Sequence, residues 1–340
     1  MLIVMKATSS ENEVQQVMDL IVDMGLSPMP VPGAHRTAIC ITGNKGTVDE
    51  GRFLQLKGVK EVIRVTKPYK LVSREVKAED TVIDLGDVKI GGTNPVQIIA
   101  GPCSVESEEQ TVEVASALKE MGVSLFRAGA FKPRTSPYDF QGFGEEGLNI
   151  LSHVREKTGM TIVSEVIDTE SVDVVNDHVD VLQVGTRNMQ NFSLLKKLSK
   201  LDKPIMLKRG MSASFEEWMN AAEYIMMGGN HQVILCERGL RTFSQHSRNT
   251  LDLSVVPLVK EVSHLPIIVD PSHGVGRRDS VRPMARAAVA SGAHALMIEA
   301  HTQPEKAYSD KAQTIDMAAL KSIMRDVEVL KGLEALSSVV

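Results

Sequence analysis

Eight short apolar runs, each followed by a charged or reactive residue, organise residues 97–301 of the chain. They read QIIAGPC, SLFRAGAF, TIVSEV, VLQVG, PIMLKRG, QVILCERG, PIIVDPSH and ALMIEAH, with amphipathic helical stretches between them. Strand followed by helix, repeated eight times, predicts a (β/α)8 barrel. The active site of such a barrel lies at the C-terminal ends of its strands. That end carries these candidates: Cys103, Arg127, Lys132, Glu165, Arg187, Lys208, Glu237, Arg238, Asp270, His273 and Glu299.

The composition is that of an ordinary globular protein and narrows the classes of function. No apolar stretch approaches the roughly 20 residues of a membrane span, and MLIVMK is too short for a signal-peptide core. We therefore expect a cytoplasmic protein. Three cysteines, Cys40, Cys103 and Cys236, argue against a disulfide framework. A net charge of −5 without a Lys/Arg-rich run gives no indication of a nucleic-acid partner.

The chain has 340 residues, about 90 more than the roughly 250 of a typical barrel. Residues 1–66 follow the order β-α-β-β-α-β, with Ser10 as an N-cap and a turn at Gly33, which predicts a ferredoxin-like domain. Polar residues 67–80 suggest a linker. Residues 81–340 then form the barrel domain, and TVIDLGDVKIGG at its start reads as a β-hairpin that caps the closed, N-terminal end of the barrel.

Four metal-ligand residue types are expected to converge at the barrel mouth. Cys103 ends the first strand, His273 the seventh and Glu299 the eighth, and Asp310 lies in the loop after it. The first, seventh and eighth strands are neighbours in a closed barrel. This mixed set suits one divalent ion, Mn, Fe, Co or Zn. Taken singly, Cys103 also fits a small buried hydrophobe, and His273 a hydrogen-bonded strand-end residue.

Cations gather at the same strand ends, which suggests a small polyanionic ligand. Guanidinium groups bind carboxylate and phosphate in planar pairs, and lysine acts as a point charge. We infer a substrate with a carboxylate and a phosphate, and a second phosphate nearby. Glu165 and Glu237 are either acidic partners of this cluster or structural pairs. Lys208 could alternatively form a Schiff base, although a metal would make that unnecessary. The cations are Arg127, Lys132, Arg134, Arg187, Lys208, Arg209, Arg238 and Arg241.

The barrel motifs resemble those of the 3-deoxy-D-arabino-heptulosonate 7-phosphate (DAHP) synthases, in particular the type Iβ group. The matching segments include AGPCSVES at 100–107, FRAGAFKPRTSPYDFQG at 126–142, ILCERGLRTF at 234–243, RNTLD at 248–252 and VDPSHGVGRRD at 269–279. They cover essentially the whole barrel. Residues 1–66 are similar to the regulatory extension of part of that group.

The resemblance implies a site and a reaction. Phosphoenolpyruvate would condense with erythrose 4-phosphate, in the first step of the shikimate pathway, with Lys132, His273 and Cys103 in catalytic roles. Whether Lys132 or a metal-bound water protonates the new alkoxide stays open. The implied metal ligands are Cys103, His273, Glu299 and Asp310. The implied phosphoenolpyruvate contacts are Arg127, Lys132, Arg187, Lys208 and Arg238. The implied aldose phosphate contacts are Arg134, Thr135 and Ser136.

Other functions compete with this one. The related 3-deoxy-octulosonate 8-phosphate synthases share the GPC opening but use arabinose 5-phosphate, and they lack the KPRTS found at 132–136. A barrel that only binds a sugar phosphate is a non-enzymatic alternative. The N-terminal domain is either a sensor, with tyrosine or phenylalanine as effector, or an assembly module without a ligand. Barrels of this family form oligomers, so the resemblance suggests a homotetramer.

Overall fold

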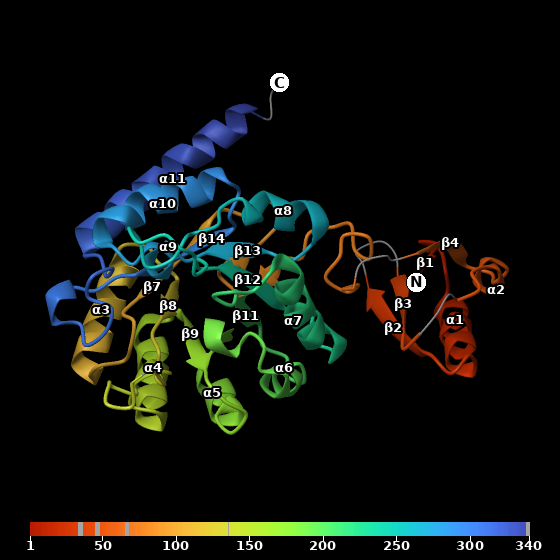
Figure 1. Ribbon diagram of the computed structural model, residues 1–340, viewed down its shortest axis with the longest axis horizontal. Coiled ribbons are helices and arrows are strands. Elements are labelled where there is room, and N and C mark those ends of the chain that lie inside the picture. Colours follow the sequence, from red (N-terminus) through yellow and green to blue (C-terminus); the bar gives the residue numbers. More distant parts are fainter. Residues whose placement is uncertain (33–36, 45–47, 65–67, 135, 338–340) are drawn as a thin grey trace. The chain divides into compact units, whose positions relative to one another are not determined.

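The chain forms two compact units, seen in Figure 1. The computed structural model describes residues 1–32, 37–44, 48–64, 68–134 and 136–337. The N-terminal unit comprises Met1–Asp80 with Glu261–His264, and the barrel unit comprises Thr81–Lys260 with Leu265–Val340. The turn predicted at Gly33 and the substrate contact predicted at Thr135 lie outside the described residues.

The N-terminal unit has the predicted ferredoxin-like arrangement. Its four strands form one antiparallel sheet in the order β2-β3-β1-β4, so that the first and third strands lie in the centre. The predicted βαββαβ domain is therefore confirmed. Its elements are β1 (Leu2–Met5), α1 (Glu11–Asp23), β2 (Ser27–Pro32), β3 (Thr37–Thr42), α2 (Gly51–Leu54) and β4 (Val59–Ile63).

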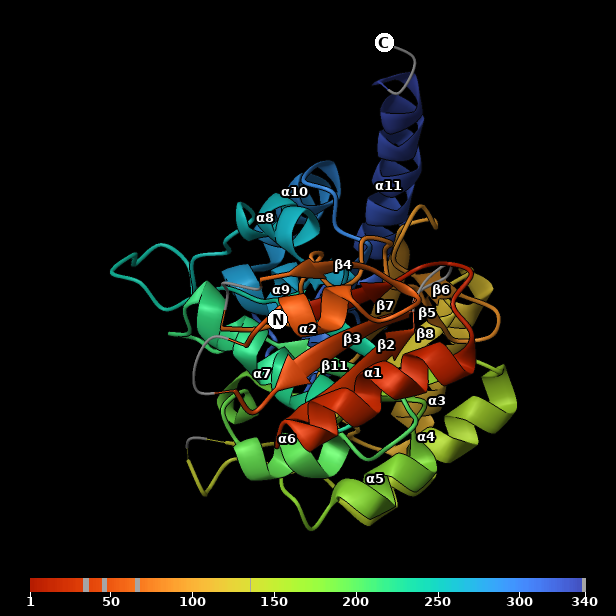
Figure 2. The same ribbon diagram turned by 90° about the vertical axis from the view of Figure 1, so that its right-hand side faces the viewer.

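Helix α1 begins where the sequence predicts it and packs on the sheet, as Figure 2 shows. The Ser10 hydroxyl accepts from the Glu13 amide, and the Glu13 carboxylate accepts from the Ser10 amide, which is a capping box. Val17 and Ile21 share one face of the helix and are buried in a core with Ile39 of β3. Amphipathic spacing thus fixes which face of the helix meets the sheet.

Residues 68–80 contain neither a helix nor a strand, yet they are not a solvated polar linker. Tyr69, Leu71 and Val72 are buried. The Ser263 hydroxyl donates to the carbonyl of Val72 (2.6 Å), which ties the segment to residues 261–264 of the same unit. Apolar residues interleaved with the charged ones drive this burial.

The barrel closes as a single parallel sheet of eight strands. Strands β14 and β7 complete the ring, and their register places Glu299 opposite Gly101. The predicted (β/α)8 barrel is confirmed. Its strands are β7 (Gln97–Gly101), β8 (Leu125–Arg127), β9 (Thr161–Val166), β10 (Val181–Val184), β11 (Ile205–Lys208), β12 (Val233–Glu237), β13 (Ile267–Val269) and β14 (Ala295–Glu299).

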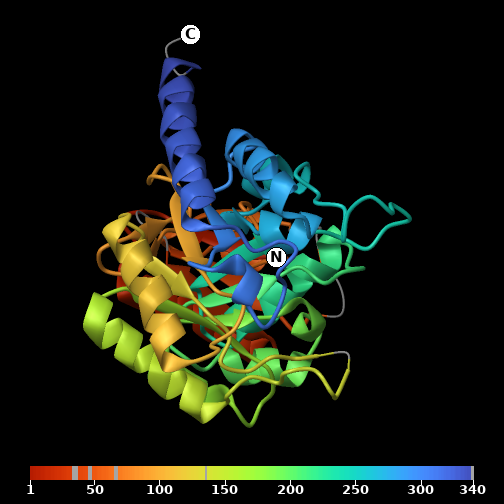
Figure 3. The ribbon, with the colours of Figure 1, turned by 90° about the vertical axis from the view of Figure 1, so that its left-hand side faces the viewer.

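A helix follows each strand and covers the outside of the barrel (Figure 1). Figure 3 shows α11 beside α10. None of the helices in the described part of the chain is long and apolar enough to cross a membrane. The helices are α3 (Glu108–Glu120), α4 (Glu145–Thr158), α5 (Val172–His178), α6 (Phe192–Leu198), α7 (Phe215–Met227), α8 (Val255–Val262), α9 (Pro271–Val275), α10 (Arg278–Ala290) and α11 (Met317–Ser337), with 3-10 turns η1 (Thr186–Asn188) and η2 (Pro304–Lys306).

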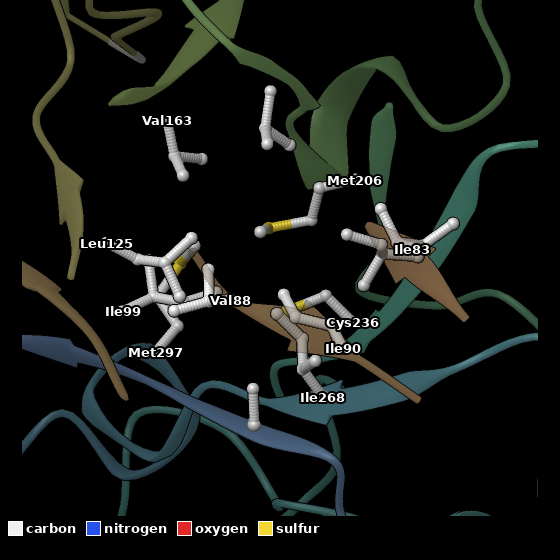
Figure 4. Close-up of a cluster of buried hydrophobic side chains, with 13 residues drawn as sticks. Ile83, Val88, Ile90, Ile99, Leu125, Val163, Met206, Cys236, Ile268 and Met297 are labelled. Carbon is white, nitrogen blue, oxygen red and sulfur yellow. The ribbon is translucent and has the colours of Figure 1, made fainter. Parts of the chain in front are cut away.

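A short hairpin fills one end of the barrel interior. Strands β5 (Ile83–Asp84) and β6 (Lys89–Ile90) pair antiparallel. Their Ile83 and Ile90 join a buried cluster with side chains of the barrel strands, among them Met206 and Ile268 (Figure 4). Because this cluster fills the barrel interior, the polar side chains gather at the C-terminal strand ends.

Candidate metal and anion site

Cys103, His273, Glu299 and Asp310 converge on one point at the barrel mouth. One ligand atom from each lies within 4.8 Å of all the others. The β14–β7 register explains half of this, since Glu299 lies opposite Gly101 and Cys103 follows two residues later. The predicted convergence is thus present in the structure. Their service as metal ligands stays a prediction.

His273 lies in a short helix and not at the end of its strand, which corrects the sequence-based placement. Strand β13 ends at Val269, and Asp270 then caps α9, its Oδ1 accepting from the amide of His273 (2.9 Å). Pro271 occupies the first helical position, where its missing N–H costs nothing. The cap and the proline therefore start a helical turn directly after β13, which the apolar pattern of PIIVDPSH does not predict.

The imidazole of His273 is held between two carboxylates. Its Nδ1 lies 2.7 Å from Asp270 Oδ2, and its Nε2 lies 3.0 Å from Glu299 Oε1. Burial acts to lower the pKa of His273, but Asp270 and Glu299 outweigh it and raise the pKa to about 10. Asp270 fixes the ring orientation, so that Nε2 faces the other candidate ligands.

Asp310 reaches the cluster through an unusual backbone conformation. It is the one non-glycine residue with positive φ (57°) in the described ranges. Its Oδ2 accepts from the thiol of Cys103 (3.0 Å), and its Oδ1 accepts from Arg248 Nη1 (3.0 Å). Strain of this kind persists where surrounding contacts enforce it, often at functional sites.

Gly101 allows the first two barrel strands to approach closely beneath the cluster. A Cβ at this position would lie 2.0 Å from the carbonyl oxygen of Arg127. No other residue fits without moving the backbone that carries Arg127 and Cys103. The glycine in the GPC motif is therefore a steric requirement of this mouth.

A polar cavity of about 240 Å³ adjoins the four candidate ligands Cys103, His273, Glu299 and Asp310, which we call the metal-ligand cluster. Every residue that the resemblance implied as a phosphoenolpyruvate contact lines this cavity, and so does Arg134. Ser136 is not among the lining residues; its hydroxyl accepts from the amide of Tyr138 (3.2 Å) in the loop itself. Among the described residues the cavity is lined by seven cationic side chains: Arg127, Lys132, Arg134, Arg187, Lys208, Arg238 and Arg248.

Two of the guanidinium groups have buried nitrogens without a hydrogen-bond partner within the described residues: Arg238 Nη1 and Arg127 Nε. Burial lowers the pKa of Arg238 from its ordinary value, and Asp270 only partly offsets this. A buried donor without a partner costs about 1–3 kcal/mol, more for a charged group. These donors therefore favour an anion in the cavity.

Lys132 lies between the metal-ligand cluster and the cavity. Its Nζ donates to the carbonyl of Cys103 (3.1 Å) and to the sulfur of Cys103 (2.9 Å). Burial acts to lower the pKa of Lys132, but Cys103 and Glu165 contribute to raising it above its ordinary value. The ammonium thus stays protonated at neutral pH, as a proton donor requires.

Two predicted cations have structural partners. Arg209 Nη1 lies 3.1 Å from Glu237 Oε2 and 3.0 Å from Asp252 Oδ2, outside the cavity lining. The structural alternative for Glu237 is therefore correct, whereas Glu165 lines the cavity. Lys208 Nζ is paired with Asp270 Oδ2 (2.7 Å), unlike the free amine of a Schiff-base lysine.

Three residues that organise the cluster have no role predicted from the sequence. Asp270, among the strand-end candidates, joins Lys208 to His273. Arg248, within the RNTLD motif, bonds to Asp310. Gln313 Nε2 donates to Glu299 Oε2 (2.7 Å). The spacing gave no signal for Arg248 or Gln313, because Arg248 reaches a carboxylate on another loop and Gln313 reaches back to the end of β14.

Fold and site together define a (β/α)8-barrel protein in which a candidate metal site adjoins an anion cavity. Residues 72–332 match the DAHP synthetase I family, and residues 1–67 match the DAHP synthase ferredoxin-like domain. The chain belongs to the DAHP synthetase I family and is an enzyme of that family, as its motifs indicated.

Named relatives agree with this assignment. A phospho-2-dehydro-3-deoxyheptonate aldolase of Thermotoga maritima is 48% identical over 97% of both chains. The crystal structure of the Thermotoga maritima DAHP synthase superimposes with a TM-score of 0.77, covering 98% of this chain and 97% of that one. A 2-dehydro-3-deoxyphosphooctonate aldolase of Geobacter sulfurreducens is 31% identical over 74% of this chain and 98% of its own length.

Proposed function

We propose that this protein condenses phosphoenolpyruvate with erythrose 4-phosphate, giving DAHP and inorganic phosphate, with one divalent metal ion as cofactor. One observation carries the proposal: a mixed Cys, His and carboxylate cluster adjoins a cavity lined by seven cations. The name of the Thermotoga relative, which is 48% identical, supports the same product.

The cluster suits one first-row divalent ion. Cys103, His273, Glu299 and Asp310 offer one sulfur, one nitrogen and two oxygens, and their separations within 4.8 Å fit bonds of about 2.0–2.3 Å to a common centre. Mn, Fe, Co and Zn are the candidates, since a thiolate disfavours Mg. When bound, the ion supplies Lewis-acid polarisation of the aldehyde oxygen.

The cations divide between two substrates. Arg127, Arg187, Lys208 and Arg238 would hold the carboxylate and phosphate of phosphoenolpyruvate, and Lys132 would reach both substrates. Arg134, which lines the same cavity, would bind the aldose phosphate. The Nε of Arg134 donates to the carbonyl of Phe140 (3.0 Å), so a phosphate bound through this nitrogen would replace that bond. Such orientation can contribute about 7–11 kcal/mol to lowering the barrier.

The reaction then balances with one water. The π electrons of phosphoenolpyruvate form a bond from its C3 to the aldehyde carbon. Lys132 donates a proton to the aldehyde oxygen from its position beside Cys103. Water adds to C2 and gives up one proton, which restores the Lys132 ammonium. The bond from C2 to the phosphate oxygen then breaks as the C2 hydroxyl passes its proton to the departing phosphate. The products are the C2 ketone and inorganic phosphate.

The N-terminal unit is proposed to bind tyrosine or phenylalanine as a feedback inhibitor. All the described residues that line the anion cavity belong to the barrel unit, so a regulatory role of the N-terminal unit would not use that cavity. An assembly module without a ligand is the competing role. A cytoplasmic homotetramer stays our prediction for the assembled state.

Phosphate release tests the proposal directly. The protein is treated with a chelator, Mn is added back, and phosphoenolpyruvate is offered with erythrose 4-phosphate or arabinose 5-phosphate. We expect metal-dependent release with the four-carbon sugar alone. Release with arabinose 5-phosphate alone would assign the octulosonate reaction, and release with neither would leave a binding module.

A further inference from the structure

Glu299 and Asp310 each turn one oxygen toward the metal-ligand cluster and the other away from it. Glu299 Oε1 lies 3.0 Å from His273 Nε2, and Asp310 Oδ2 lies 3.0 Å from Cys103 Sγ. The opposite oxygens are both engaged: Glu299 Oε2 by Gln313 and Asp310 Oδ1 by Arg248. Each carboxylate is thereby held to offer a single oxygen.

Gln313 links these two outer contacts into one unit. Its Nε2 donates to Glu299 Oε2 (2.7 Å), and its Oε1 accepts from Arg248 Nη1 (3.0 Å), the nitrogen that also donates to Asp310. The amide orientation is determined, because a carboxylate only accepts and a guanidinium only donates. Gln313 is buried. Its backbone N–H donates to the backbone carbonyl of Asp310 (3.1 Å), which closes the turn that carries the side chains of Asp310 and Gln313.

We propose that Gln313 is a positioning residue that sets how Glu299 and Asp310 present their oxygens to the metal. The inference rests on the proposed metal site and deepens it. Gln313 touches neither the cavity nor a ligand atom facing the cluster; it acts through Glu299 and, by way of Arg248, through Asp310. Outer partners of this kind orient ligands, and their loss commonly costs 10–100-fold in metal affinity.

Binding of Co(II) to the metal-free protein tests the role without an activity assay. Gln313→Met keeps the length of the side chain and removes both hydrogen bonds. We expect affinity for Co(II) to fall by about 10–100-fold, and the visible spectrum at saturation to shift as the carboxylates change their presentation. Gln303→Met, at an exposed position of the same connection between β14 and α11, is the matched control and should leave both unchanged.

A double-mutant cycle tests whether Gln313 and Arg248 act together on the metal site. Arg248→Met removes the other half of the link from a side chain that is 45% exposed, with little risk to folding. If Gln313 works through Arg248, the combined variant should bind Co(II) more tightly than the two single losses added together predict. Additive losses, or a Gln313→Met protein with wild-type affinity and spectrum, overturn the inference. A wild-type protein that binds no Co(II) overturns the metal site and this inference together.

Discussion

The sulfur of Cys103 and the Oδ2 of Asp310 lie 3.0 Å apart although 207 positions separate them in the chain. Two features of the fold produce this contact. Closure of the barrel between β14 and β7 brings the two chain regions to the same sector. The hydroxyls of Ser104 and Ser309, each adjacent to one of the pair, then bond at 2.9 Å and hold the loops in register.

Replacing Cys103 with serine should impair metal binding more than it impairs folding. The exchange is nearly isosteric but substitutes a poor ligand for a thiolate. We expect affinity for a divalent metal to fall by at least about 100-fold, the upper range for loss of an outer partner. Metal content after dialysis, measured by mass spectrometry, checks this. Cys236→Ser, at a buried position of β12 that is not one of the four candidate ligands, is the control. An unchanged metal content in Cys103→Ser would remove Cys103 from the ligand set.

Lys132→Met should reduce turnover while leaving the metal in place. A positioned proton donor is worth about 10²–10⁴-fold, and we expect kcat to fall within that range with near-stoichiometric metal. Lys306→Met makes the same exchange at an exposed position after β14 and should be neutral. Steady-state kinetics with erythrose 4-phosphate check both variants. Near-normal turnover of Lys132→Met would assign the proton to another donor.

Asp270→Asn should destabilise the metal-free protein, because it leaves the buried Lys208 ammonium without its carboxylate. Breaking a buried pair costs about 3–5 kcal/mol, measurable as a loss in the free energy of unfolding in urea at neutral pH. Asp139→Asn, an exposed carboxylate at the same mouth, should stay within about 0.5 kcal/mol.

The loss of unfolding free energy in Asp270→Asn should also depend on pH. Burial acts to raise the pKa of Asp270, but His273 and Lys208 hold it well below its ordinary value. A lowered carboxyl pKa stabilises the folded state above the unfolded pKa of about 3.9, and this contribution disappears as pH falls through the folded value. The difference between wild type and Asp270→Asn should therefore narrow in acid. A constant difference would mean that packing, and not charge, is what the substitution removes.

The strand ends were predictable because each strand is a short apolar run, and because the eightfold repeat of such runs predicts a closed barrel. Arg127, Lys208 and Glu299 are each the last residue of a strand, so the pattern alone placed them in the mouth. The metal-ligand cluster followed from strand adjacency in the same way. These inferences use only periodicity and topology.

Other features depend on loop conformation, which periodicity does not encode. The helical turn at His273 results from a cap and a proline, the positive φ of Asp310 from contacts between loops, and the buried residues around Leu71 from tertiary packing. Ser136 lies in a loop whose internal hydrogen bonds turn its hydroxyl elsewhere. Gln313 was unpredictable because a single glutamine carries no pattern.

Oxidation should distinguish the cysteines. The sulfur of Cys103 accepts from the Lys132 ammonium (2.9 Å), and a neighbouring cation of this kind is typical of reactive cysteines. Burial raises the pKa of the Cys236 thiol far above its ordinary value and leaves it inert. Mild peroxide should therefore oxidise Cys103 in the metal-free protein, so that activity no longer returns when Mn is added, with recovery on adding thiols if oxidation stops at the sulfenic stage. Peptide mass spectrometry locates the modification; oxidation of Cys236 first would contradict this assignment.

Removing residues 1–66 should leave catalysis and abolish feedback inhibition. All the described residues that line the anion cavity or form the metal-ligand cluster belong to the barrel unit. We expect the truncated chain to keep metal-dependent phosphate release and to be no longer inhibited by tyrosine or phenylalanine. Because residues 68–80 bury Leu71 and Val72, a second truncation after Asp80 controls for newly exposed apolar surface. If either truncated enzyme is still inhibited, the effector binds the barrel; if the full chain is never inhibited, the N-terminal unit serves assembly.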